Sequence, residues 1–65
     1  MDIVQEKRQG VAVFAVVGRI DSTTSDTLER ALTHALDAGQ RRLVVDFEGV
    51  TYISSAGLRV LLMVA

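Results

Sequence analysis

The chain begins with short apolar runs typical of strands. Residues 11–17, Val-Ala-Val-Phe-Ala-Val-Val, are apolar throughout and rich in β-branched side chains, which predicts a strand apolar on both faces that ends at Gly18. Residues 3–7 predict a weaker edge strand, and Arg8-Gln9-Gly10 predicts the turn between the two. Because the connection is so short, these two strands must run antiparallel.

A polar cluster at residues 18–25 precedes a predicted helix. Thr23 is followed three residues later by Asp26, which resembles a capping box with Asp in place of Glu. Gly39 is typical of a helix C-terminal cap. Between these ends, apolar side chains recur at helical spacing: Leu28, Ala31, Leu32, Ala35 and Leu36.

The segment 43–65 predicts a second strand–helix pair, and the rest of the chain is organised around it. Its apolar start, Leu43-Val44-Val45, predicts a strand buried on both faces, followed by a turn-like segment. A helix is then predicted by the apolar positions Leu58, Leu61, Leu62 and Ala65. A strand–helix–strand unit implies parallel pairing through a right-handed crossover. The sequence therefore predicts an α/β fold in the order β-β-α-β-α, with a mixed sheet.

Length and charge limit the possible functions. Sixty-five residues form one small domain, which buries only about 60% of the surface that its unfolded chain exposes. The net charge is −1 with both signs interspersed, so no basic field indicates nucleic acid or an anionic membrane as partner. The N-terminus lacks the features of a signal peptide, and no apolar run approaches the ~20 residues of a membrane span. We therefore expect a cytoplasmic protein without a membrane partner.

Ser54 and Ser55 lie where the second helix is predicted to begin. The simpler interpretation makes them N-caps, worth about 1 kcal/mol. The functional interpretation makes Ser55 a phosphorylation site, because a phosphate there would lie beside the unpaired N–H groups and positive dipole end of the helix. Such a modification would be tolerated by the fold and would act on a docked partner through charge and bulk.

Other chemistry-bearing residues give weaker signals. Asp46, predicted at the carboxyl end of a strand, is either a functional carboxylate or an acceptor for loop amides. Asp21 is similarly either an N-cap or a site residue. His34, the only histidine, is predicted on the solvated face of the first helix, so a serine hydrolase would lack its base. The chain has no cysteine, no cluster with metal-ligand spacing and no glycine-rich nucleotide loop, so we expect no metal or other cofactor, and neither nucleotide hydrolysis nor dinucleotide redox chemistry.

Two motifs carry a family resemblance that spans nearly the whole chain. Residues 45–62, Val-Asp-Phe-Glu-Gly-Val-Thr-Tyr-Ile-Ser-Ser-Ala-Gly-Leu-Arg-Val-Leu-Leu, resemble the signature of the STAS domain, the fold of bacterial anti-sigma factor antagonists. Upstream, residues 17–22, Val-Gly-Arg-Ile-Asp-Ser, are similar to the family's second-strand segment, commonly Gly-x-Leu-Asp. The resemblance implies a mixed sheet with helices packed on one side and no catalysis by the domain.

The resemblance also implies a partner-switching function in transcription regulation. Antagonists of this family bind an anti-sigma factor that is also a serine kinase, and so free the sigma factor. Phosphorylation by that kinase, which uses ATP, releases the antagonist, and a serine phosphatase resets the cycle. The alternative is a non-catalytic STAS scaffold, or an accessory module of a stress-sensing complex or a transporter.

The family's site residues transfer position by position. The acceptor hydroxyl lies two residues before the glycine, which makes Ser55 the expected phosphorylation site. Ala56 replaces a second Ser or Thr, and Ser54 replaces the Asp that many members have beside the acceptor. Asp21 and Gly57 match the docking-loop aspartate and the close-packing glycine. The expected partner-binding residues are Asp21, Ser22, Ser54, Ser55, Ala56, Gly57 and Arg59.

Relative to the family, residues 1–65 correspond to only the N-terminal part of a domain. A complete member continues past the second helix with further strands and helices. Without them, one edge of the third strand and one face of the second helix would be uncovered. We therefore expect the 65-residue chain alone to be unstable as a monomer and to form a homodimer or aggregate.

Overall fold

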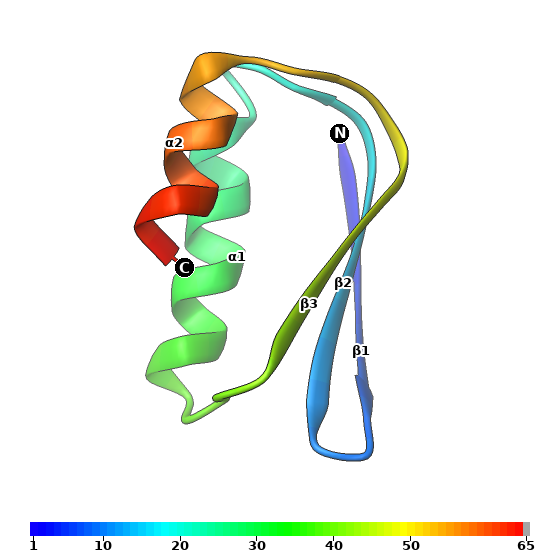
Figure 1. Cartoon of the computed structure of the whole chain (residues 1–65), viewed down its shortest axis with the longest axis vertical. Coiled ribbons are helices and arrows are strands. Elements are labelled where there is room, and N and C mark those ends of the chain that lie inside the picture. Colours follow the sequence, from blue (N-terminus) through cyan, green and yellow to red (C-terminus); the bar gives the residue numbers. More distant parts are fainter. Residues whose placement is uncertain (65) are drawn as a thin grey trace.

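The computed structural model describes residues 1–64 and has five elements. They are β1 (Asp2–Arg8), β2 (Val11–Ile20), α1 (Ser25–Asp37), β3 (Leu43–Ile53) and α2 (Ser55–Val64). Both helices lie on the same face of the sheet (Figure 1). The predicted α/β class and element order are confirmed, while Ala65, predicted as an apolar position of the second helix, lies outside the described residues.

The sheet is mixed, with the strand order β1-β2-β3. β1 pairs antiparallel with β2 through a two-residue turn at Gln9 and Gly10, whose φ angles of 51° and 81° suit a hairpin connection. β2 pairs parallel with β3, and α1 connects them. The antiparallel hairpin and the parallel crossover pair are therefore as the sequence predicts.

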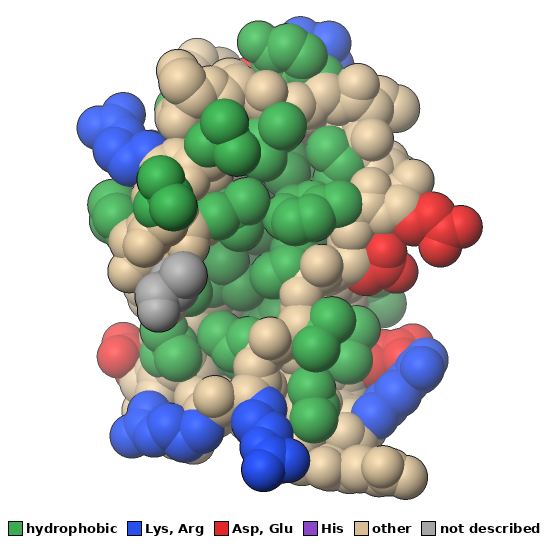
Figure 2. Space-filling model, viewed as in Figure 1, with side chains coloured by type: hydrophobic (Ala, Val, Ile, Leu, Met, Phe, Trp, Pro, Cys, Tyr) green, Lys and Arg blue, Asp and Glu red, His purple; other side chains and the backbone are tan. Residues whose placement is uncertain are grey.

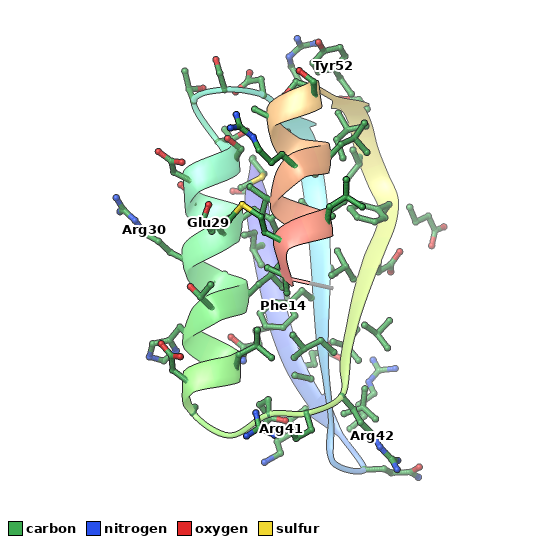
Figure 3. The ribbon with its side chains drawn as sticks, turned by 60° about the vertical axis from the view of Figure 1, so that its left-hand side comes forward. Phe14, Glu29, Arg30, Arg41, Arg42 and Tyr52 are labelled. Carbon is green, nitrogen blue, oxygen red and sulfur yellow. The ribbon has the colours of Figure 1, made fainter. Side chains whose placement is uncertain are left out.

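The core lies between β2 and the two helices. Alternate side chains of β2 point to the helical face, and Phe14 is completely buried there (Figure 3). The predicted stripe of α1 meets it, with its members either buried or half-buried. The buried apolar residues of this core are Ala12, Phe14, Val16, Ile20, Leu28, Leu32, Ala35 and Val60.

The sequence predicts the C-terminal end of α1 correctly but not its N-terminal end. At its C-terminus, Gly39 has a φ of 95° and the Gln40 N–H donates to the Ala35 carbonyl over 3.0 Å, so the predicted glycine cap is confirmed as a Schellman motif. At its N-terminus the predicted capping box is wrong. The N-cap is Thr24, one residue later, because Thr23 donates its hydroxyl to the Asp21 carboxylate instead.

Both parallel strands run further than the sequence predicts. β2 continues through Gly18 to Ile20, and Gly18 has a φ of 105° inside the strand. β3 continues from Leu43 to Ile53, so the turn expected after residue 45 is wrong. The register between β2 and β3 shifts at two places, and at each one β3 has an extra residue. The strand continues past both shifts.

β3 is also less buried than predicted. Val44 is 49% exposed, because the helices cover only one face of the sheet. Asp46 lies in the middle of β3 and not at its carboxyl end, where it accepts a hydrogen bond from the Glu48 N–H over 2.9 Å. Of the two alternatives for Asp46, hydrogen bonding to a nearby amide is the one that the structure shows.

The core-facing side of α2 differs from the prediction by one position. Gly57 and Val60 are buried, whereas Leu58 and Leu62 are 50% and 79% exposed. Both patterns have helical spacing and share Leu61, so spacing alone could not decide between them. Among the described residues, neither helix combines the length and apolar character needed to cross a bilayer.

Apolar surface is concentrated beside α2 and β3. A groove of about 310 Å³ lies among α1, α2 and β3, with Leu61 and Val64 on one wall and Leu43 and Val45 on another. Figure 2 shows apolar side chains gathered over the middle of this face. Within residues 1–64, β3 pairs along one edge only. Exposed large apolar side chains on these two elements are Val44, Phe47, Tyr52, Leu58, Leu62 and Met63.

We predict that the isolated 65-residue chain associates through this surface. Its thermal unfolding midpoint is expected to rise with protein concentration, because association stabilises the folded state by mass action. Differential scanning calorimetry at concentrations spanning a hundredfold measures this. Leu62→Glu, at the most exposed of these positions, should reduce the dependence. A sharp, reversible transition independent of concentration would contradict the prediction.

Candidate functional site

The predicted site residues gather where β2 and β3 end. The Ser54 N–H, between β3 and α2, donates to the Ile20 carbonyl, the last residue of β2, over 2.8 Å. This bond ties the start of α2 to the loop that leads into α1, at the upper end of Figure 1. Asp21 and Ser55 each follow one of the bonded residues, so both lie at this edge.

The two adjacent serines have different environments. The Ser54 hydroxyl accepts a hydrogen bond from the Gly57 N–H at 3.3 Å, and its carbonyl accepts the first helical bond, from Leu58, at 3.0 Å. Ser54 is therefore the N-cap of α2. Ser55, the first residue of the helix, is exposed, and within residues 1–64 its hydroxyl makes no hydrogen bond. The cap function thus belongs to Ser54 alone and leaves the Ser55 hydroxyl accessible.

Gly57 lets α2 approach the sheet closely. A Cβ atom added at this residue would lie 2.6 Å from Cγ2 of Ile20 and 3.0 Å from Cγ1 of Ile53. Both neighbours are β-branched side chains at strand ends, which have little freedom to move aside. Only glycine therefore fits at this position with the present distance between helix and sheet.

Asp21 organises the loop before α1. Its Oδ1 atom accepts hydrogen bonds from the Thr23 hydroxyl at 2.7 Å, the Thr23 N–H at 3.0 Å and the Thr24 N–H at 3.1 Å. These bonds, the Thr23 hydroxyl foremost, lower the pKa of Asp21 from 3.8 to about 2. Its Oδ2 atom lies 4.0 Å from Nε of Arg19. Asp21 therefore orders the loop while its side chain remains one-third exposed.

Arg19 and Tyr52 form a pair that the sequence analysis did not identify. The Arg19 guanidinium carbon lies 4.3 Å from the centroid of the Tyr52 ring. Both side chains are exposed near the ends of their strands, and Figure 3 labels Tyr52. The register places these two residues opposite one another because of the two shifts between β2 and β3, the second of which follows Gly18. No pattern in the sequence signals these shifts.

A polar cleft lies between the two helices, with Ala56 of the first turn of α2 in its lining. It has a volume of about 190 Å³ and is lined by Asp26 and Glu29 from α1 and by Ala56, Arg59 and Met63 from α2. Ala56 and Arg59 belong to the predicted partner-binding set, and this cleft is where the structure places them. Asp26 and Glu29 were not predicted as site residues.

Of the remaining candidate residues, one lies at this edge and two lie elsewhere. Ser22 is exposed in the loop between β2 and α1, and so lies at the same edge as Asp21. His34 is exposed in the last turn of α1, as predicted, and Asp46 lies within β3; neither belongs to this edge. Among the described residues, no three His, Cys, Asp or Glu side chains are placed to hold a metal ion.

Comparison with known proteins assigns the family. The STAS domain model matches residues 2–65, so the chain belongs to the STAS domain family. It is 40% identical over all 65 residues to the putative anti-sigma factor antagonist BtrV of Bordetella bronchiseptica, covering 56% of that protein. It is 36% identical over 52 residues, 80% of this chain, to the anti-sigma-F factor antagonist RsfB of Mycobacterium tuberculosis, covering 43% of that protein.

Solved structures agree with this assignment. A crystal structure of an anti-sigma factor antagonist from Mycobacterium paratuberculosis superposes with a TM-score of 0.91 at 32% identity, over 97% of this chain and 54% of that one. The anti-sigma factor antagonist SpoIIAA in its unphosphorylated form shares the fold, with a TM-score of 0.77 at 17% identity over 95% of this chain and 58% of that one. The chain spans about half the length of these relatives.

We predict that Asp21→Asn changes how stability depends on acidity. The pKa of Asp21 is lower in the folded state, so its stabilising contribution is complete above pH ~4 and is lost as pH falls toward 2. The wild-type protein should therefore lose stability over this window faster than Asp21→Asn, and the two profiles should run parallel above pH ~5. Urea unfolding across this range measures both. Parallel profiles throughout would show that the hydrogen bonds to Asp21 add no stability.

Proposed function

We propose that this chain acts as an anti-sigma factor antagonist that switches partners by phosphorylation at Ser55. The observation that carries the proposal is the division between the two serines: Ser54 caps α2, and the Ser55 hydroxyl is exposed and unbonded in the described structure. Relatives named as antagonists, at 40% and 36% identity, support the same function.

In the unmodified state, the chain binds an anti-sigma factor that is also a serine kinase. The docking surface comprises the loop at Asp21 and Ser22 and the first turns of α2 at Ser54, Ser55, Ala56 and Arg59, with Gly57 holding the helix in place. The hydrogen bonds to Asp21 keep its loop ordered before binding, so less conformational entropy is lost on association.

Phosphorylation then releases the partner. The Ser55 Oγ attacks the γ-phosphorus of ATP held by the kinase, the hydroxyl proton passes to a base of the kinase, and ADP is the leaving group. The phosphate carries a charge near −2 at neutral pH and lies beside free N–H groups at the start of α2, so the fold tolerates it. The new charge and bulk lie inside the docking surface and weaken the complex. A serine phosphatase hydrolyses the phosphoester and restores the unmodified chain.

The proposed function is non-catalytic and takes place in the bacterial cytoplasm, where the kinase and ATP are found. A hydrolase would need a base beside Ser55, and the only histidine, His34, lies in the last turn of α1. Ser55 is thus the phosphate acceptor in the partner's reaction and not the catalytic nucleophile of a hydrolase.

We also propose that residues 1–65 act as the N-terminal part of a longer STAS domain. The relatives are nearly twice as long, and the apolar groove at Leu43, Leu61 and Val64 is of the kind that further strands and helices cover. In a chain that has only these residues, a second copy covers the same surface. The concentration dependence of unfolding described above distinguishes the two states.

We predict a single phosphate on Ser55 after incubation with the cognate anti-sigma kinase and ATP. Intact-mass and peptide mass spectrometry measure the modification, and a pull-down with and without ATP measures binding. Ser55→Ala should bind the kinase but accept no phosphate. Thr27→Ala, which removes an exposed hydroxyl from α1 outside the docking surface, is the matched control and should behave as wild type.

Two results would count against the proposal. Binding without modification would leave a docking module whose Ser55 is only the first residue of a helix. Neither binding nor modification by any anti-sigma kinase of the organism would favour a STAS scaffold or an accessory module of a stress-sensing complex or transporter instead.

A further inference from the structure

Arg59 lies one helical turn after Ser55 on the same face of α2. Residues four apart in a helix are surface neighbours, and helical side chains tilt toward the N-terminus, so a side chain as long as that of Arg59 can reach a group attached at position 55. Both residues are exposed. An anion placed N-terminal to a cation at this spacing is the more favourable of the two orders.

Arg59 is available for a new ionic partner. Within residues 1–64, the two ion pairs join Arg8 to Glu6 and Arg19 to Asp21, and no carboxylate oxygen lies within 4.0 Å of the Arg59 guanidinium. Arg19, the other arginine at this edge, is already stacked on Tyr52. Arg59 instead lines the cleft that it shares with the carboxylates of Asp26 and Glu29.

We propose that Arg59 binds the phosphate carried by phosphorylated Ser55. This inference rests on the proposed modification of Ser55 and adds how the chain itself responds to it. The planar guanidinium can donate two parallel hydrogen bonds to phosphate oxygens, which the Lys ammonium cannot do. The phosphate is then held from two sides, by the first N–H groups of α2 and by Arg59.

The contact between Arg59 and the phosphate would weaken partner binding in a second way, in addition to the charge and bulk of the phosphate. In the unmodified chain, Arg59 belongs to the docking surface and is free to contact the partner. Once bound to the phosphate it is withdrawn from that surface, and the cleft that it shares with Asp26 and Glu29 becomes more negative. Phosphorylation thereby changes the charge of the cleft as well as that of Ser55.

The second ionisation of the phosphoserine reports directly on Arg59. Its pKa is near 6 in a free phosphoserine, and a neighbouring guanidinium lowers it by favouring the dianion. The other charged groups near the phosphate, which are Asp21 and Arg19 at the loop and Asp26 and Glu29 on α1, stay the same in every variant compared. A difference between variants therefore measures the Arg59 contact alone.

We predict that Arg59→Gln raises this pKa by about 0.3 unit, the size expected for one exposed pair at this spacing. Phosphoserine is incorporated at position 55 during translation, and the phosphorus NMR resonance is followed across pH. Arg30→Gln is the matched control, because Arg30 is exposed on α1 and points away from α2 (Figure 3), and it should leave the pKa unchanged. Arg59→Lys should give an intermediate value.

Equal pKa values for wild type and Arg59→Gln would overturn the inference, as would an equal shift in Arg30→Gln. No kinase or partner takes part in this titration. Its failure therefore leaves the switch at Ser55 untouched, and a failure of the kinase assay leaves the titration valid.

Discussion

The close approach of α2 to the sheet at Gly57 is the constraint on which the rest of the site depends. A side chain there would collide with Ile20 and Ile53, the last residues of the two parallel strands. Because residue 57 has none, the helix begins directly at the strand ends, and the Ser54 N–H reaches the Ile20 carbonyl. The approach also sets the rotation of α2, which turns Ser55 and Arg59 outward and Val60 inward.

Polar contacts also hold the site in place. The Asp21 carboxylate, bonded to Thr23 and Thr24, orders the neighbouring loop, and the Ser54 hydroxyl caps the helix. Neither function requires Ser55. A phosphate added to Ser55 therefore replaces no existing interaction, and it enters a position that the helix dipole already favours for an anion. Modification of this kind changes surface charge without requiring the fold to rearrange.

The order of strands and helices could be predicted from the spacing of apolar residues, because the patterns of β2 and α1 each fit only one type of element. The Schellman cap at Gly39 is likewise local and predictable. The errors occur where tertiary contacts decide between local alternatives. Residues 46–49 look like a turn, but pairing with β2 holds them in β3. Leu58 and Leu62 have the spacing of a buried helix face, but the close contact at Gly57 turns a different face of α2, with Gly57 and Val60, toward the core.

The candidate site was predicted as a set of residues but not as a geometry. The position of Ser55 and Asp21 before predicted helices made them candidates, and family resemblance added Gly57. The structure shows why the three lie together, through the bond from Ser54 to Ile20. The Arg19–Tyr52 pair depends on a register shift between β2 and β3, so the sequence could not reveal it. Likewise, only the structure could show whether Ser54 or Ser55 caps the helix, because the two side chains are the same.

The most direct test of this account is the free energy of unfolding of Gly57→Ala, measured with urea. Helix propensity alone would make alanine the more stable by up to about 1 kcal/mol. The account predicts the opposite sign, a loss of about 1–3 kcal/mol, because the added methyl group forces α2 away from Ile20 and Ile53. Thr27→Ala, at an exposed position of α1 away from the sheet, should change stability far less. A Gly57→Ala protein as stable as wild type, or more so, would contradict the claim that this close approach holds the site together.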